Sequence, residues 1–273
     1  MAPVTLAVVP SATPGNSRVA LDAVCDALGT ILGSPVVAAT PDSYPALAYA
    51  LLRDRVQYAW MSPALMVLTE ERIRLRPLLS AVRGDRTDYC AALFVAAERS
   101  LHDVADLRGM RVAWVDHASA SGYLCPRISL AARGLDPDAF FGEELFLRSH
   151  AEVVRAVLDG RADVGATYAE RPAPGQPIRR AGFLDVAPER SIRVLEWTRP
   201  IPNDVIVGHG LLSFAEHRAF GDAMLELSAR APGRKLLFNA FHAEHFVTTP
   251  RHALRPLFEL VKSARANGLL RQL

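Results

Sequence analysis

The sequence contains little cysteine, few aromatic residues and almost no excess charge of either sign. Only three of its 273 residues are cysteine, 7% are aromatic, and 31 basic residues stand against 29 acidic ones. An odd number of cysteines without metal-ligand spacing gives no support for a disulfide framework, so we expect Cys25, Cys90 and Cys125 to be buried thiols. The balanced charge argues against a nucleic-acid-binding surface.

Long hydrophobic runs are also missing. The strongly apolar stretches 90–97 and 153–158 fall far short of the roughly 20 residues of a membrane-spanning helix, so we expect no direct membrane insertion. The chain starts with an alternating apolar run, 4–9, and shows no charged and long apolar leader. This start predicts a cytoplasmic protein unless a leader has been removed. With 50% apolar residues, intrinsic disorder is excluded.

Short β-branched runs alternate with runs at helical spacing along most of the chain. We predict strands at 5–9, 35–40, 58–61, 91–97, 110–115, 145–147, 162–167 and 192–197. Predicted helices lie between them, and further helices span about 213–230 and 250–266. Strands that alternate with helices predict an α/β fold with parallel sheets covered on both faces.

The predicted elements form two α/β series joined by a stiff proline-rich segment, 199–204. This arrangement predicts two lobes, 1–88 plus 204–273 and 89–203, with a ligand cleft between them. In open α/β sheets, ligands bind at the carboxyl ends of strands, where helices begin. Polar residues at these points are therefore candidate ligand-binding residues.

The loop 115–123 places small and hydroxyl residues between a predicted strand and a predicted helix. Ser119 and Ser121 stand at the start of that helix, followed by Gly122. Free backbone N–H groups and the helix dipole make such a position suitable for an anion. The alternative is that Ser119 or Ser121 only caps its own helix.

A second helix start carries a histidine. Ser149 and Glu152 have the spacing of a capping box, in which each side chain bonds the other residue's N–H group. His150 lies in the first turn of this helix, where its imidazole can join the helix terminus in binding an anion. The alternative is a surface histidine, or one whose hydrogen bonds are satisfied within the protein.

Several motifs resemble one family over nearly the whole chain. The matching stretches are 58–63 (YAWMSP), 106–113 (DLRGMRVA), 119–123 (SASGY), 149–150 (SH), 160–164 (GRADV) and 201–204 (IPND). They resemble the phosphonate, phosphate and phosphite substrate-binding proteins of ABC transporters, which have a type 2 periplasmic-binding fold with two lobes. The resemblance implies a non-catalytic, periplasmic protein that closes around a small oxyanion and works with a transporter permease.

The resemblance also implies a set of ligand-binding residues. They are Ser119, Ala120, Ser121 and His150 around the oxyanion, Tyr44 and Tyr89 as lining residues, and Glu170 and Asp204 for a ligand ammonium group. Ala120 stands where the family usually has threonine, so one hydroxyl donor is missing while the backbone N–H remains.

Other functions stay open at this stage. A cytoplasmic enzyme of the same fold would use His150, Glu170 and Asp204 as acid or base. The sensing module of a regulator would need an attached output domain. Cys125 leaves room for a thiol-binding ligand such as an arsenic oxyanion.

The stretch 242–245 (HAEH) matches no standard zinc motif, so neither a metal nor a cofactor is expected. We expect Trp60 mainly in the core, with a cleft wall as its alternative role.

Overall fold

The computed structural model describes residues 3–9, 18–70, 72–266 and 268. The chain divides into two compact units: unit 1 is Met1–Thr87 with Pro202–Pro256, and unit 2 is Asp88–Ile201 with Leu257–Leu273. The predicted lobes put all of 204–273 into the first lobe, whereas the structure groups the last segment with unit 2. Its helix α9 (Arg255–Ala266) buries Leu257, Val261 and Ala264. Such a pattern predicts a buried face but not which unit covers it.

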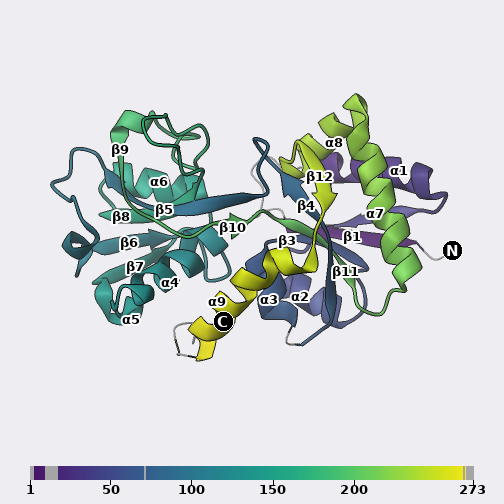
Figure 1. Ribbon diagram of the computed structural model, residues 1–273, viewed down its shortest axis with the longest axis horizontal. Coiled ribbons are helices and arrows are strands. Elements are labelled where there is room, and N and C mark those ends of the chain that lie inside the picture. Colours follow the sequence, from purple (N-terminus) through teal and green to yellow (C-terminus); the bar gives the residue numbers. More distant parts are fainter. Residues whose placement is uncertain (1–2, 10–17, 71, 267, 269–273) are drawn as a thin grey trace. The chain divides into compact units, whose positions relative to one another are not determined.

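Unit 1 is a six-stranded sheet with helices on both faces (Figure 1). The strand order is β12-β4-β11-β3-β1-β2. The strands are β1 (Val4–Val8), β2 (Val36–Ala39), β3 (Tyr58–Met61), β4 (Leu75–Val82), β11 (Val205–His209) and β12 (His245–Thr248). Helices α1 (Arg18–Leu32), α7 (Phe214–Ala229) and α8 (Ala231–Phe241) cover one face, and α2 (Tyr44–Leu52) and α3 (Pro63–Glu70) cover the other.

The apolar spacing of the sequence accounts for the way α1 packs. Its buried residues Leu21, Val24, Cys25 and Leu28 repeat every three to four positions, so one helical face meets the sheet. The helix ends before Gly33, whose φ of 62° lies in the left-handed region that favours glycine.

Unit 2 has a second sheet, in the order β10-β5-β8-β6-β7, with β9 paired to β5. Its strands are β5 (Asp88–Ala96), β6 (Arg111–Trp114), β7 (Glu143–Phe146), β8 (Val164–Ala169), β9 (Ile192–Trp197) and β10 (Ile201–Pro202). Helix α6 (His150–Leu158) packs Val153, Val154 and Val157 against one face. Helices α4 (Cys125–Ala132) and α5 (Pro137–Phe140) lie on the other (Figure 1). Short 3₁₀ turns are η2 (Val104–Leu107), η4 (Glu189–Ser191) and η5 (Arg251–Leu254).

Both sheets are mixed, so the prediction of parallel sheets holds only for part of each. β2, β1 and β3 are parallel in unit 1, as are β7, β6 and β8 in unit 2. The remaining strands β4, β11 and β12, and β5 with β8 and β9, pair antiparallel. Local pattern predicts a strand, but its direction depends on which distant strand it meets.

The predicted helix over 121–133 begins differently from expectation. Its first turn is a π-helix, η3 (Ala120–Leu124), followed by α4. Leu124 N donates to Ser119 O at 3.0 Å, and Gly122 O accepts from Val115 N at 3.2 Å. The second bond joins this first turn to Val115, the residue directly after β6.

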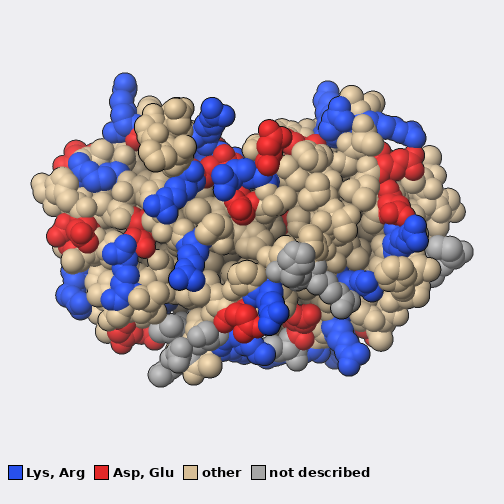
Figure 2. Space-filling model, in the orientation of Figure 1, with Lys and Arg blue, Asp and Glu red and all other residues tan. Residues whose placement is uncertain are grey.

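Charges on the surface are mixed. On the face shown in Figure 2, basic and acidic side chains are interspersed within each unit, in line with 31 basic and 29 acidic residues. In the described ranges, every helix is too short or too polar to cross a bilayer.

Candidate functional site

The serine loop and the histidine predicted from the sequence belong to one edge of the unit 2 sheet. β6 pairs in parallel with both β7 and β8, so the carboxyl ends of these three strands lie side by side. η3 begins just beyond β6, and α6 begins just beyond β7. Both η3 and α6 contact β8. The structure therefore brings the two predicted helix starts together at this edge.

The turn that leads from β6 into η3 is held by its own side chains. Asp116 Oδ1 accepts from Ala118 N at 2.8 Å, and Ser119 Oγ accepts from Gly122 N at 3.1 Å. Ser119 thus caps its own helix, as the structural alternative predicted, while its hydroxyl proton stays available. A Cβ atom on Gly122 would lie 2.4 Å from Val115 Cγ2. Only glycine allows this close approach of η3 to the strand.

The start of η3 carries several donors that the fold leaves unused. The backbone N–H groups of Ala120 and Ser121 have no acceptor among the described residues. Ser121 is only 3% exposed, and no hydrogen bond of its hydroxyl occurs within the described part of the chain. Groups of this kind usually find a partner when they are buried. Together they form a cluster of donors suited to an oxyanion.

His150 is partly buried beside β8. Its Nδ1 lies 2.9 Å from Thr167 Oγ1, and its ring meets the Tyr168 ring edge-on at 5.0 Å. Burial lowers the pKa of His150 to about 4, because the charged imidazolium loses water contact. The ring is therefore neutral near pH 7. Its Nε2 has no hydrogen-bond partner in the described ranges and is free to meet a ligand.

The predicted capping box at α6 is half present. Ser149 Oγ accepts from Glu152 N at 3.1 Å, as expected. The Glu152 carboxylate pairs instead with Arg155 and Arg161 on the exposed side of the chain. Arg148 precedes the cap with a φ of 64°. The N–H groups of His150 and Ala151 also have no acceptor among the described residues.

Two further predicted residues lie at the neighbouring end of β5 and β8. The pairing of Cys90 with Ala169 brings Tyr89 and Glu170 to the same end of this antiparallel pair. Glu170 lies 3.5 Å from Arg180 Nη1, and Arg180 also lies over the Tyr168 ring. Glu170 therefore has a protein cation as its partner.

Asp204 and Tyr44 belong to unit 1. Asp204 lies 2.9 Å from Nη2 of Arg83, whose guanidinium also donates to the carbonyl groups of Phe241 and His242. The adjacent Asn203 donates to the carbonyl groups of Ala81 and Arg86. These bonds fasten the returning chain to the end of β4. Tyr44 is the first residue of α2, directly after its cap Ser43.

The weaker candidates find structural roles. Trp60 is 1% exposed and packs against Phe241 and Phe246, so it is a core residue rather than a wall. Burial raises the pKa of Cys125 to about 12, which keeps its thiol protonated. All three cysteines are buried and free.

Residues in the stretch 242–245, for which no metal site was predicted, make other contacts. Glu244 accepts from Gly84 N at 2.9 Å, and His245 pairs with Val82 in the sheet. In the described ranges, no three histidine, cysteine or acidic side chains gather as metal ligands would.

Sequence reasoning missed the residue that positions His150. Thr167 is fully buried in β8, and its hydroxyl faces the imidazole. A Cβ atom on Gly182 would lie 2.1 Å from Thr167 Oγ1, so glycine at that position leaves room for the hydroxyl. A polar residue within an otherwise apolar strand run was the available signal.

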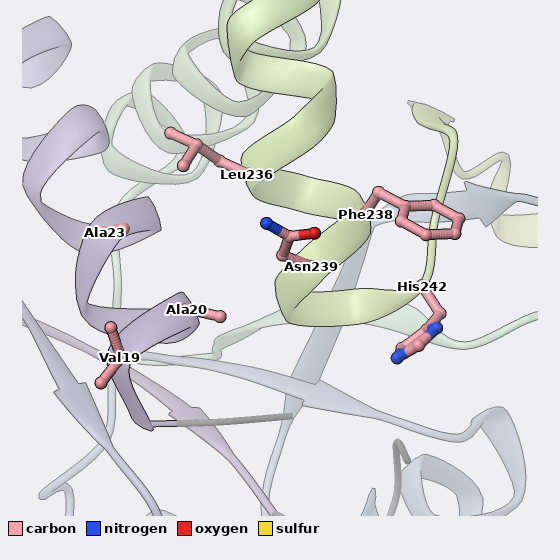
Figure 3. A pocket seen from close by; sticks show the side chains of 7 residues that line it. All are labelled: Val19, Ala20, Ala23, Leu236, Phe238, Asn239 and His242. Carbon is pink, nitrogen blue, oxygen red and sulfur yellow. The ribbon is translucent and has the colours of Figure 1, made fainter. Parts of the chain in front are cut away.

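A pocket of about 410 Å³ lies elsewhere, in unit 1 (Figure 3). Helix α1 and helix α8 supply most of its wall. Its lining residues are Val19, Ala20, Ala23, Leu236, Phe238, Asn239 and His242. None of the predicted ligand residues lines it.

The two mixed α/β units have the type 2 periplasmic-binding fold. The fold agrees with solved structures. A Xanthomonas citri protein bound to ATP has a TM-score of 0.77 at 21% identity, covering 97% of this chain and 99% of that one. PhnD1 of Prochlorococcus marinus in complex with methylphosphonate has a TM-score of 0.74 at 16% identity, covering 96% and 98%.

The chain belongs to the periplasmic phosphonate substrate-binding proteins of ABC transporters, because that family's model matches residues 6–252. This family consists of binding proteins rather than enzymes, in agreement with the non-catalytic prediction. The phosphate-import protein PhnD of Mycolicibacterium smegmatis is 23% identical over 175 residues, which are 60% of this chain. The match spans about half (54%) of the length of that relative.

Proposed function

We propose that this chain binds a phosphonate or phosphate-like oxyanion and releases it unchanged, as the substrate-binding component of an ABC transporter. The observation that carries the proposal is the set of unused donors at the start of η3, the N–H groups of Ala120 and Ser121. Membership of the phosphonate-binding family supports it. So do the relative that imports phosphate and the neighbour that holds methylphosphonate.

His150 supplies a neutral donor in this proposal. If the Thr167 hydroxyl donates to Nδ1, the ring proton resides on Nε2 and points to the ligand. A neutral donor stabilises an anion without the desolvation cost of a second buried charge. The ligand charge is then met by hydrogen bonds and by the dipoles of η3 and α6 rather than by a cation.

The number of donors sets the expected affinity. Each hydrogen bond to a charged group contributes about 1.5–3 kcal/mol. Four bonds, from the two N–H groups, the Ser121 hydroxyl and His150, sum to about 6–12 kcal/mol, a range that includes the roughly 8 kcal/mol of micromolar affinity. Ala120 adds no hydroxyl, so its contribution is limited to the backbone.

Calorimetry tests the proposal directly. Purified protein is titrated with phosphate, phosphite, methylphosphonate and 2-aminoethylphosphonate, with chloride as the reference anion. We expect micromolar binding of at least one phosphorus oxyanion. Ser121→Ala should weaken it at least several-fold. Ser213→Ala, a serine cap in unit 1, is the matched control and should leave the affinity unchanged.

Folded protein that releases no heat with any of the four ligands would exclude the phosphonate or phosphate assignment. Equal affinities of wild type and Ser121→Ala would exclude the start of η3 as the site. We further propose that the loaded protein delivers its ligand to a membrane permease, which the same family membership supports.

A further inference from the structure

Three aromatic rings gather at the site edge of unit 2. The His117 ring lies over Phe146 with centroids 4.1 Å apart, and it meets Tyr123 edge-on at 4.9 Å. Tyr123 and Phe146 are 5.5 Å apart. We refer to His117 and Phe146, with Tyr123 behind them, as the aromatic shelf.

The aromatic shelf lies next to the unused donors. His117 precedes Ser119 by two residues, in the turn between β6 and η3. Phe146 is the last residue of β7, four positions before His150, and it pairs with Trp114 of β6. The shelf thus lies at the same strand ends from which both helix starts emerge.

The shelf is only partly a core feature. Phe146 is 37% exposed, whereas its ladder partner Trp114 is fully buried. His117 is partly exposed, yet its Nδ1 is buried without a partner in the described ranges. A phenylalanine or leucine would fill the same space without an unpaired nitrogen, so packing alone does not explain a histidine here. Burial lowers the pKa of His117 and favours its neutral ring.

We propose that the aromatic shelf binds the organic substituent of the ligand and favours planar, aromatic groups on phosphorus. The inference rests on the proposed function, since the oxyanion would bind at the start of η3 and the substituent beside it. An aromatic ring packs favourably on another aromatic ring, either stacked with an offset or edge to face, and gains energy beyond that of the buried area alone. Arylphosphonates are therefore preferred over alkylphosphonates of equal charge.

Calorimetry with phenylphosphonate and methylphosphonate tests the preference. The strength of aromatic pairs corresponds to a factor of about two to ten in affinity. We expect phenylphosphonate to bind five- to tenfold more tightly than methylphosphonate. In Phe146→Ala, the ratio of the two affinities should fall to about one. Phe238→Ala, which removes an exposed ring from unit 1, is the matched control and should keep the wild-type ratio.

Phe146→Leu separates the loss of the ring from a loss of folding, because it retains most of the side-chain volume. It should also bring the ratio close to one. If methylphosphonate binds and phenylphosphonate binds equally tightly or more weakly, the aromatic shelf is overturned and the proposed function stays intact. A wild-type ratio in both Phe146 variants would overturn it as well. Absence of binding by both probes would overturn the shelf, whereas the proposed function would be excluded only if phosphate, phosphite and 2-aminoethylphosphonate also gave no heat.

Discussion

The two units share a plan but use polar groups at their strand ends differently. Each contains three parallel strands, β2-β1-β3 in unit 1 and β7-β6-β8 in unit 2. In unit 1, the buried Arg83 bonds Asp204 and two carbonyl groups, and Asn203 bonds two more. In unit 2, the backbone N–H groups of Ala120 and Ser121 have no acceptor within the described part of the chain.

This difference suggests that the polar groups of unit 1 contribute to folding stability, whereas the donors of unit 2 contribute to ligand binding. Polar groups that find protein partners contribute their hydrogen-bond energy to folding, so little is left for a ligand. Donors held in place without partners retain that energy for a guest that completes them. Substitutions in the Arg83 cluster should therefore change the free energy of unfolding, and those at η3 should change affinity.

The largest expected effect is in unit 1. Arg83→Met leaves Asp204 and several carbonyl groups without their cation, and should lower the free energy of unfolding by about 2–3 kcal/mol. Arg18→Met, which breaks the exposed pair with Asp22, is the control and should cost less than about 1 kcal/mol. Urea unfolding measures both. A similar loss of unfolding free energy in the two variants would show that the bonds of Arg83 to Asp204 and to the carbonyl groups do not stabilise the fold.

Gly122→Ala affects both properties of unit 2. The added methyl group would lie 2.4 Å from Val115 Cγ2, so η3 must move. We expect a stability loss of about 1–3 kcal/mol, together with weaker oxyanion binding by calorimetry. Gly221→Ala, where a Cβ atom meets nothing within 4 Å, should be neutral or stabilise α7 by up to about 1 kcal/mol. An unchanged oxyanion affinity in Gly122→Ala would show that η3 is not part of the binding site.

The two serine caps provide a smaller contrast. In unit 1, Glu216 Oε2 accepts a hydrogen bond from Ser213 N at 2.8 Å, which completes a capping box. In the described ranges, Glu152 of unit 2 accepts no such bond from Ser149 N. Glu216→Ala should cost about 0.5–1 kcal/mol. Glu152→Ala should cost less than about 0.5 kcal/mol, because its ion pairs are exposed. Thermal unfolding of the two variants measures both stability losses. A larger loss for Glu152→Ala than for Glu216→Ala would contradict the prediction.

The last expected effect is a pH dependence of the free energy of unfolding. The pKa of His150 is about 4 in the folded protein, against about 6.5 when unfolded. Between these values the unfolded chain binds more protons, so stability falls as the pH is lowered from about 6.5 to about 4. His150→Gln should lessen this fall. Unfolding curves at pH 7 and pH 5 measure it, and an equal fall in both proteins would contradict a neutral, buried imidazole.

Local patterns predicted much of the fold. The spacing of Leu21, Val24 and Leu28 predicted α1, and the run 110–115 predicted β6. Helix α8 was missed, because its sequence APGRKLLFNAF begins with a proline and a glycine and has few strongly periodic positions. The antiparallel partners of β4 and β11 depend on contacts far apart in sequence, which no local pattern encodes.

The site divides in the same way. The positions of Ser119, Ser121 and His150 at helix starts were predictable, because each stands where a helix begins after a strand. The Thr167 contact and the ion pair of Glu170 with Arg180 join distant segments. Whether an acidic side chain is available to a ligand depends on such partners. The binding roles of all eight predicted residues stay predictions: Tyr44, Tyr89, Ser119, Ala120, Ser121, His150, Glu170 and Asp204.

The buried thiols make the protein convenient to label. Cys25, Cys90 and Cys125 are all enclosed, and burial raises the pKa of Cys25 and Cys125 to about 12. Maleimide dyes attack thiolates, so the native side chains should be silent at neutral pH. One cysteine introduced on the exposed edge strand, as in Glu143→Cys, would then carry a single fluorophore without prior removal of the others.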